Sequence, residues 1–255
     1  MSESICFGCG ATLTPGNKFC MECGLPNPTS APSTKEIRTD ESGPRYSLVL
    51  VRGDGGHAST YALGGQEHVA GRDDGIILFP DDATVSPTHC TFFYKDGRLM
   101  VKDEGSANGT FVRVTTPIAL KSDDHFIAGE QVFIYEDGRT VEANADEEGT
   151  FFFGTPIAHW YFKLTQVLQG GKPGNVFCAR KARVLIGREG TDFNFPDDRF
   201  MSGKHVAVEF RDSAVWLADQ ESRNGTFLML RPGEERLLNG GDYLFIGRQL
   251  VKVVQ

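Results

Sequence analysis

The sequence lacks a long hydrophobic run, a visible secretory signal and an excess of positive charge. Its longest apolar runs, such as Phe151-Phe152-Phe153, are far too short to cross a bilayer. No basic segment followed by an apolar one stands at the N-terminus, so we expect a cytoplasmic protein with no membrane partner. The formal net charge of −8 argues against broad nucleic-acid binding, which depends on neutralising phosphates.

A periodic apolar stripe long enough to predict a helix is also missing. Short β-branched and aromatic runs occur instead, for example at 48–51, 91–94 and 206–210, and clusters of Gly, Asp and Asn separate them. The 255 residues are 40% hydrophobic, which is enough for two modest cores. The sequence therefore predicts a mainly β protein with two antiparallel β-sandwiches in a row.

A pattern of about forty residues occurs twice, and each position of the second copy follows the first by 116 residues. The first copy contains Gly71-Arg72, Phe79-Pro80-Asp81-Asp82, Ser86-x-x-His89, Asp103 and Ser106-x-Asn108-Gly109-Thr110-Phe111. The second copy contains Gly187-Arg188, Phe195-Pro196-Asp197-Asp198, Ser202-x-x-His205, Asp219 and Ser222-x-Asn224-Gly225-Thr226-Phe227. Because Arg, Ser, His and Asn persist while the apolar residues around them differ, we interpret the repeat as a duplicated site.

The ordered set Gly-Arg, Ser-x-x-His and Ser-x-Asn-Gly-Thr resembles the forkhead-associated (FHA) family, whose domains bind phosphothreonine peptides. The resemblance covers about residues 44–140 and 159–255, which we expect to be two FHA domains. Alone, Asn-Gly is also the commonest tight hairpin turn, and Gly-Arg suits an ordinary loop. The chemistry fits phosphate, because a planar guanidinium and a hydroxyl can converge on it while an Asn amide clamps the peptide backbone.

The resemblance implies a phosphopeptide-binding role for one Arg, one Ser and one Asn in each copy. The Arg would contact the phosphate or the adjacent backbone, the Ser would donate to phosphate oxygens, and the Asn would hold the peptide main chain. These residues are Arg72, Ser86 and Asn108 in the first copy and Arg188, Ser202 and Asn224 in the second. The same resemblance gives structural roles, as a brace of the loops or a turn former, to Gly71, His89, Gly109, Gly187, His205 and Gly225.

The two copies depart differently from the family pattern. After the Ser, many members have Arg or Asn, whereas this chain has Pro87 and Gly203. Pro87 has no backbone N–H to donate, but Gly203 keeps one and remains a candidate phosphate contact. Before the Asn, the first copy has Ala107 and the second has Arg223, a further candidate.

Residues 44–140 hold 9 Lys and Arg against 14 Asp and Glu, a net of −5, while residues 159–255 hold 14 against 11, a net of +3. We therefore predict that the second copy binds phosphate more strongly than the first.

Residues 1–27 contain two Cys-x-x-Cys pairs, which predict a small zinc ribbon with one structural Zn²⁺. A segment this short cannot bury a sufficient core, so the metal would supply its folding free energy. Two disulfides would need an oxidising compartment, and a redox site would need a βαβ unit, so both are weaker alternatives. The expected zinc ligands are Cys6, Cys9, Cys20 and Cys23. We expect Cys90 and Cys178 to be inert core residues.

The sequence thus predicts a ribbon at 1–27, a flexible linker at 28–43, FHA domains at 44–140 and 159–255, and an acidic linker at 141–158. We expect a non-enzymatic adaptor that recognises phosphothreonine proteins, such as a Ser/Thr kinase or its substrate. A phosphorylated linker could also bind back to an FHA site. The alternatives are a phosphorylation-gated nucleic-acid regulator that uses the ribbon, and a phosphate-independent interaction scaffold.

Overall fold

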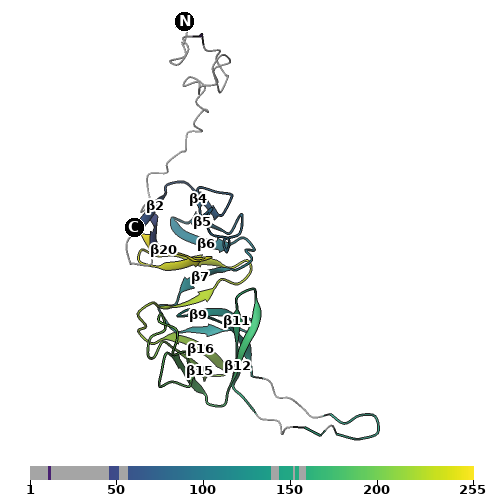
Figure 1. The fold of residues 1–255 in the computed structure, drawn as a ribbon. Helices are drawn as coiled ribbons and strands as arrows, with labels where there is room; N and C mark the ends of the chain where they lie inside the picture. The colour runs from purple at the N-terminus through teal and green to yellow at the C-terminus, as the bar shows by residue number, and fades with distance from the viewer. Residues whose placement is uncertain (1–10, 13–45, 52–56, 139–143, 152, 155–158) are drawn as a thin grey trace. The chain divides into compact units, whose positions relative to one another are not determined.

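The computed structural model describes residues 11–12, 46–51, 57–138, 144–151, 153–154 and 159–255 (Figure 1). These residues form twenty β-strands and no helix, which confirms the prediction of a mainly β fold. In the described part of the chain there is accordingly no helix long and apolar enough to span a membrane. The predicted ribbon at 1–27 and the linker at 28–43 lie outside the described residues, apart from Ala11 and Thr12.

Each repeat supplies ten strands in the same order. Those of the first repeat are β1 (Tyr46–Val51), β2 (His57–Leu63), β3 (Glu67–Gly71), β4 (Ile77–Leu78), β5 (Cys90–Lys95), β6 (Arg98–Asp103), β7 (Thr110–Arg113), β8 (Ile118–Leu120), β9 (His125–Ala128) and β10 (Gln131–Asp137). Those of the second repeat are β11 (Phe162–Leu168), β12 (Lys172–Ala179), β13 (Arg183–Gly187), β14 (Phe193–Asn194), β15 (Val206–Arg211), β16 (Ala214–Asp219), β17 (Thr226–Met229), β18 (Glu235–Leu237), β19 (Tyr243–Ile246) and β20 (Gln249–Val254).

The strands are arranged in three sheets. Two five-stranded sheets have the orders β18-β6-β5-β3-β4 and β14-β13-β15-β16-β8. A ten-stranded sheet has the order β12-β11-β10-β9-β17-β7-β19-β20-β1-β2 and continues through the antiparallel pairing of β7 with β17. Each five-stranded sheet shares a hydrophobic core with one half of the ten-stranded sheet. We call the unit that contains β1–β6 the first sandwich and the unit that contains β11–β16 the second sandwich.

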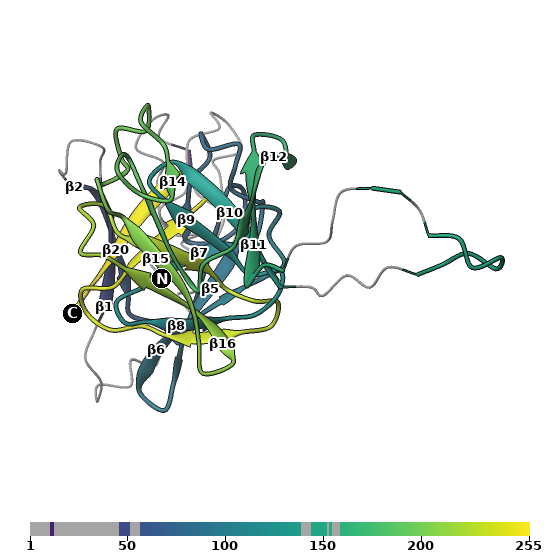
Figure 2. The same ribbon diagram turned by 90° about the horizontal axis from the view of Figure 1, so that it is seen from below.

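The two repeats exchange their last three strands. In the first sandwich, β18 pairs with β6 and β20 pairs with β1. Reciprocally, β8 pairs with β16 in the second sandwich, where the two strands lie side by side in Figure 2, and β10 pairs with β11. The predicted ranges 44–140 and 159–255 each contain ten of the strands, but neither range supplies all the strands of one sandwich.

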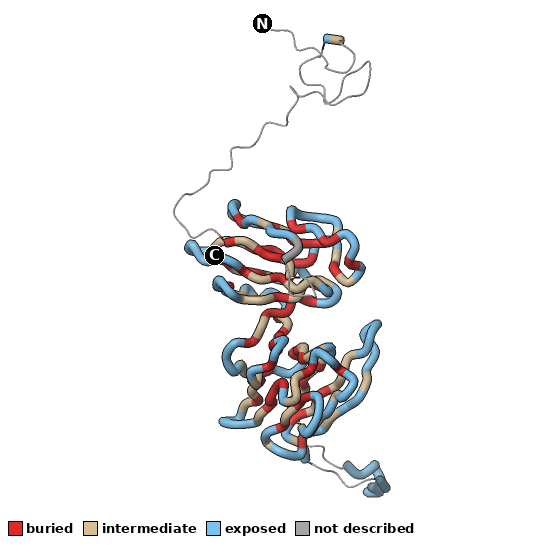
Figure 3. The backbone as a smooth tube through the Cα atoms, turned by 60° about the vertical axis from the view of Figure 1, so that its left-hand side comes forward, coloured by how far each residue is buried: buried red, intermediate tan, exposed pale blue. Residues whose placement is uncertain are grey.

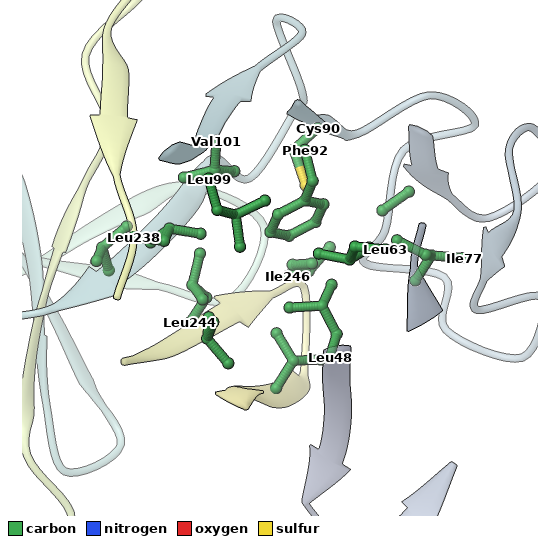
Figure 4. Close-up of a cluster of buried hydrophobic side chains, with 14 of the residues drawn as sticks. Leu48, Leu63, Ile77, Cys90, Phe92, Leu99, Val101, Leu238, Leu244 and Ile246 are labelled. Atoms are coloured by element: carbon green, nitrogen blue, oxygen red, sulfur yellow. The ribbon is translucent and has the colours of Figure 1, made fainter. Parts of the chain in front are cut away.

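The hydrophobic cores follow the exchanged strands. Figure 4 shows Leu238, Leu244 and Ile246 of the second repeat beside Leu48 and Phe92 of the first. Both Leu48 and Leu244 are completely buried. The second core likewise joins side chains of β9 and β10 to side chains of the second repeat. Buried segments lie inside both sandwiches (Figure 3), so apolar burial stabilises the exchanged pairing.

The chain passes from one sandwich to the other in the segments directly after β7 and β17. Beyond β7 and β17, the amides of Val114 and Leu230 extend the β7–β17 ladder by donating to the carbonyls of Thr226 and Thr110, over 2.8 and 2.9 Å. The side chain of Val114 then enters the second core, and that of Leu230 enters the first. Each segment thus continues straight across into the other sandwich before its next strand begins.

An ion pair holds the segment after β17, where the chain passes into the first sandwich. Arg231 follows β17 and donates to both carboxylate oxygens of Asp124, a residue of the first repeat just before β9, over 2.8 and 2.6 Å. The Asp124 side chain is only 4% exposed, and it also accepts a bond from the Lys121 amide. A bidentate pair at a nearly buried carboxylate has the geometry of a strong charge-assisted contact. It ties the second repeat's crossing segment to the first repeat's exchanged strands.

The two isolated cysteines differ in burial. Cys90 is completely buried in the first core, as predicted, and burial raises the pKa of its thiol strongly. Cys178, in β12 at the edge of the ten-stranded sheet, is exposed. The expectation that Cys178 is a core residue was therefore wrong. An edge strand is covered on fewer sides than a central one, so a strand-like sequence alone could not reveal this exposure.

Candidate functional site

Three loops of each repeat carry the predicted binding residues. In the first repeat, Arg72 follows β3, Ser86 lies between β4 and β5, and Asn108 lies between β6 and β7. Arg188, Ser202 and Asn224 occupy the same loops of the second repeat. We call these two sets the first site and the second site.

The Arg and Ser loops meet through their backbones. The amide of Arg72 donates to the carbonyl of Ser86 over 2.9 Å, and the amide of Arg188 donates to the carbonyl of Ser202 over the same distance. This approach requires glycine before each Arg. A Cβ at Gly71 would collide with the Pro87 carbonyl oxygen, and a Cβ at Gly187 would collide with the corresponding carbonyl of Gly203.

The Ser and Asn loops also meet. The hydroxyl of Ser202 accepts a hydrogen bond from the amide of Arg223 over 3.0 Å, and the Asn224 side-chain amide donates to the carbonyl of Phe200 over 2.8 Å. In the first site, the hydroxyl of Ser86 and the amide of Asn108 make the equivalent bonds. Among the described residues, the Ser202 hydroxyl hydrogen and the Asn224 amide oxygen have no partner, so both can bond to a ligand.

A buried histidine connects the loops of each site. Nδ1 of His205 accepts from the amide of Ser202 over 3.1 Å, and Nε2 lies 3.0 Å from the carbonyl oxygen of Gly225. His89 makes the same two contacts with Ser86 and Gly109. An accepting Nδ1 requires the neutral tautomer that carries its proton on Nε2. Each histidine thus holds the Ser loop against the Asn-Gly turn and is itself completely buried.

The acid dependence of stability follows from these histidines. Burial lowers the pKa of both His89 and His205 below the ordinary 6.5, against weaker opposing effects of the Gly carbonyls and nearby carboxylates. The unfolded chain therefore binds more protons below pH 6.5, and the free energy of unfolding falls as the pH drops. We expect a loss of up to about 1.4 kcal/mol per histidine and pH unit, measured by urea unfolding at pH 7.5, 6.5 and 5.5.

The matched control for this pH series is His125→Gln, because the ring of His125 is only half-buried and contacts the backbone of its own turn. This variant keeps both buried histidines, so the fall in stability between pH 7.5 and pH 5.5 should persist. Equal stability at pH 7.5 and 5.5 would contradict the expectation.

Two further carboxylates shape each site. The Asp219 carboxylate accepts hydrogen bonds from the amide and hydroxyl of Ser222 and from the hydroxyl of Thr226. Asp198 holds the start of the Ser loop by accepting from the amides of Phe200 and Met201. Both Asp residues belong to the repeated sequence pattern, but their roles were not predicted. Their presence in both copies was the signal that could have identified them.

The two sites differ in charge. In the first site, the guanidinium of Arg72 donates to the Asp73 carboxylate over 3.3 Å. Within the described part of the chain, the side chain of Arg188 makes no hydrogen bond or ion pair. Three cations of the second repeat's loops replace uncharged residues of the first, namely Arg199 for Ala83, Lys204 for Thr88 and Arg223 for Ala107. The second site therefore presents a free guanidinium in a more cationic setting.

The fold and these loops define a mainly β protein with FHA-type sandwich sheets. Two segments, residues 68–129 and 184–247, match the family model of the FHA domain. The chain is thus an FHA domain protein with two matching segments, one in each repeat.

Curated relatives share part of this sequence. The chain is 36% identical over 89 residues to the glycogen accumulation regulator GarA of Mycolicibacterium smegmatis, covering 34% of this chain and 56% of that protein. It is 34% identical over 93 residues to the oxoglutarate dehydrogenase inhibitor of Corynebacterium diphtheriae, covering 36% of this chain and 64% of the relative. The chain therefore spans less than two thirds of the length of either relative.

Solved structures of FHA domains also match. The FhaA FHA domain, complexed with the intracellular domain of Rv3910, is 30% identical with a TM-score of 0.23, over 35% of this chain and 97% of that one. A structure from a study of phosphothreonine-dependent FHA domain interactions is 27% identical with a TM-score of 0.21, over 34% of this chain and 88% of that one.

The predicted zinc ligands Cys6, Cys9, Cys20 and Cys23 lie outside the described residues. In the described ranges, no group of three or more His, Cys, Asp or Glu side chains is arranged to hold a metal ion.

Proposed function

We propose that the protein is a non-enzymatic, cytoplasmic adaptor that recognises phosphothreonine-containing proteins in Ser/Thr kinase signalling. The observation that carries this proposal is that hydrogen bonds join the Arg188, Ser202 and Asn224 loops, while the Arg188 guanidinium has no partner among the described residues. A dianionic phosphate is the ligand that best matches a guanidinium and a hydroxyl on adjoining loops. The names of the two relatives, a regulator and an inhibitor, support a signalling role.

A peptide array with the full chain tests the proposal. We expect phosphothreonine peptides to bind about a hundredfold or more tightly than their unphosphorylated forms, because two or three charge-assisted hydrogen bonds contribute about 1.5–3 kcal/mol each. Phosphoserine peptides should bind about fourfold more weakly than phosphothreonine peptides, since they lack a methyl group whose burial is worth about 0.8 kcal/mol. Calorimetry with the best peptide in its three forms gives the ratios.

Equal affinity for the phosphorylated and bare peptides would instead favour a phosphate-independent interaction scaffold. A nucleic-acid regulator would show binding to DNA or RNA that weakens steeply with salt.

We also propose that Cys6, Cys9, Cys20 and Cys23 hold one structural Zn²⁺. Four thiolates in two Cys-x-x-Cys pairs are the donor set of a closed tetrahedral zinc site. One equivalent of zinc in the purified full chain, lost on Cys20→Ser, is the expected result of metal analysis. A chain that is purified without zinc and forms no zinc complex on titration would contradict it.

A further inference from the structure

The carboxylate of Asp198 links the second site to the other repeat. Its Oδ1 accepts from the amides of Phe200 and Met201, over 2.9 and 3.0 Å, at the start of the loop that carries Ser202. Its Oδ2 accepts from the amide of Glu130 and the side-chain amide of Gln131, over 2.8 and 2.9 Å. Gln131 is the first residue of β10, which the first repeat contributes to the second sandwich, and Glu130 directly precedes it.

Asp82 makes the mirror arrangement in the first site. Its Oδ1 accepts from the amide and hydroxyl of Thr84, over 2.9 and 2.5 Å. Its Oδ2 accepts from the amide of Arg248 and the side-chain amide of Gln249, over 3.0 and 2.7 Å. Burial alone would raise the pKa of the Asp82 carboxyl, but hydrogen bonds from Thr84, Gln249 and Arg248 together lower it. The carboxylate is therefore held in its charged, accepting form.

The loop between Asp198 and Ser202 is also held by Asn224, the residue predicted to bind the peptide main chain. Phe200 donates its amide to Asp198, and its carbonyl accepts from the side chain of Asn224. A shift of the Asp198 carboxylate would thus move the loop between Asp198 and Ser202 relative to Asn224. Asp198 is buried, and its second oxygen accepts from the Glu130 amide and from Gln131, the one side chain that donates to it among the described residues.

We infer that Gln131 and Gln249 are positioning residues that act across the repeats: Gln131 of the first repeat orders the second site, and Gln249 of the second repeat orders the first. This inference rests on the proposed phosphopeptide function of the loops, and on the exchange of β8–β10 with β18–β20. Without the exchange, Gln249 would lie in the same sandwich as Ser202, and Gln131 in the same sandwich as Ser86. Which of the two glutamines affects the second site therefore shows whether the strands are exchanged.

The experiment uses the full chain with Arg72→Ala, so that only the second site is measured, and the best phosphothreonine peptide from the array. We expect Gln131→Ala to weaken binding about three- to tenfold, because one hydrogen bond to a charged group is lost. Gln131→Glu should weaken it at least as much, since a like charge then faces Asp198. Gln249→Ala should leave the affinity of the second site within twofold of its parent.

The matched control is Gln166→Ala. Gln166 donates to the side-chain oxygen of Gln131 over 2.7 Å, so this variant disturbs the neighbourhood of Gln131 but leaves the donor to Asp198 in place. It should keep the parent affinity. Weakening by Gln249→Ala without weakening by Gln131→Ala would overturn the inference, as would the absence of any effect of either change.

A second readout requires no ligand. Gln131→Ala should speed hydrogen exchange at the amides of Phe200 and Met201, whereas Gln249→Ala should not. If no phosphorylated peptide binds the parent chain, the proposed function fails, and this exchange pattern still decides the structural inference. If peptides bind and the exchange pattern is reversed, the positioning inference alone fails.

Discussion

Replacing Arg188 with alanine should abolish most phosphothreonine-peptide binding by the intact protein, with a loss of about a hundredfold. Its guanidinium is free of other side chains in the described structure, and it lies on the loop whose backbone is bonded to Ser202. Two charge-assisted hydrogen bonds to a phosphate, each worth about 1.5–3 kcal/mol, account for a loss of this size. Calorimetric titration of the variant with one phosphopeptide set measures it.

Arg72→Ala should cost the intact protein much less. The Arg72 guanidinium already donates to Asp73, so a phosphate would have to compete with that carboxylate. The control is Arg180→Ala, an exposed arginine outside the three loops, which should bind like the parent. Equal losses for Arg188→Ala and Arg72→Ala would refute the ranking of the two sites.

Leu244→Ala should destabilise the first sandwich, although Leu244 belongs to the second repeat. Leu244 is completely buried in the core with Leu48 and Phe92, and removing a buried leucine costs about 2–5 kcal/mol. Hydrogen exchange should therefore accelerate most in β5 and β6. The fall in the free energy of unfolding is measured by urea denaturation of the full chain.

The matched variant is Phe126→Ala in the first repeat. Phe126 is completely buried in the second core, and its loss should cost about 3–5 kcal/mol. Exchange should then accelerate most in β15 and β16. If each substitution loosened the sandwich of its own repeat instead, the strand exchange would be disproved.

The sequence allowed the mainly β fold to be predicted, and it also predicted two binding sites, because the evidence for both is local. Arg188, Ser202 and Asn224 occur in an ordered pattern that the first repeat duplicates, and the structure brings their loops together. Asn-Gly turns also have a local cause, since Gly109 and Gly225 adopt φ values of 75° and 84° that other residues rarely adopt.

The exchange of strands could not be predicted, because two similar repeats offer each strand two similar partners. Apolar alternation in β8 or β18 satisfies its own repeat's sandwich as well as the other's. In the structure, the exchange takes place in the short stretches after β7 and β17, where Val114 and Leu230 extend the ladder and Arg231 pairs with Asp124. The contact of Asp82 with Gln249 spans 167 residues, a separation at which no local pattern identifies a partner.

The exchanged topology also affects how the chain folds during its synthesis. Ribosomes deliver the chain from its N-terminus, and most domains begin to fold as soon as they emerge. Here the strands that close the first sandwich, β18–β20, are made last, after the whole second sandwich has been translated. Until then, the first sandwich either remains incomplete, with unpaired sheet edges, or pairs with β8–β10 and later exchanges them for β18–β20.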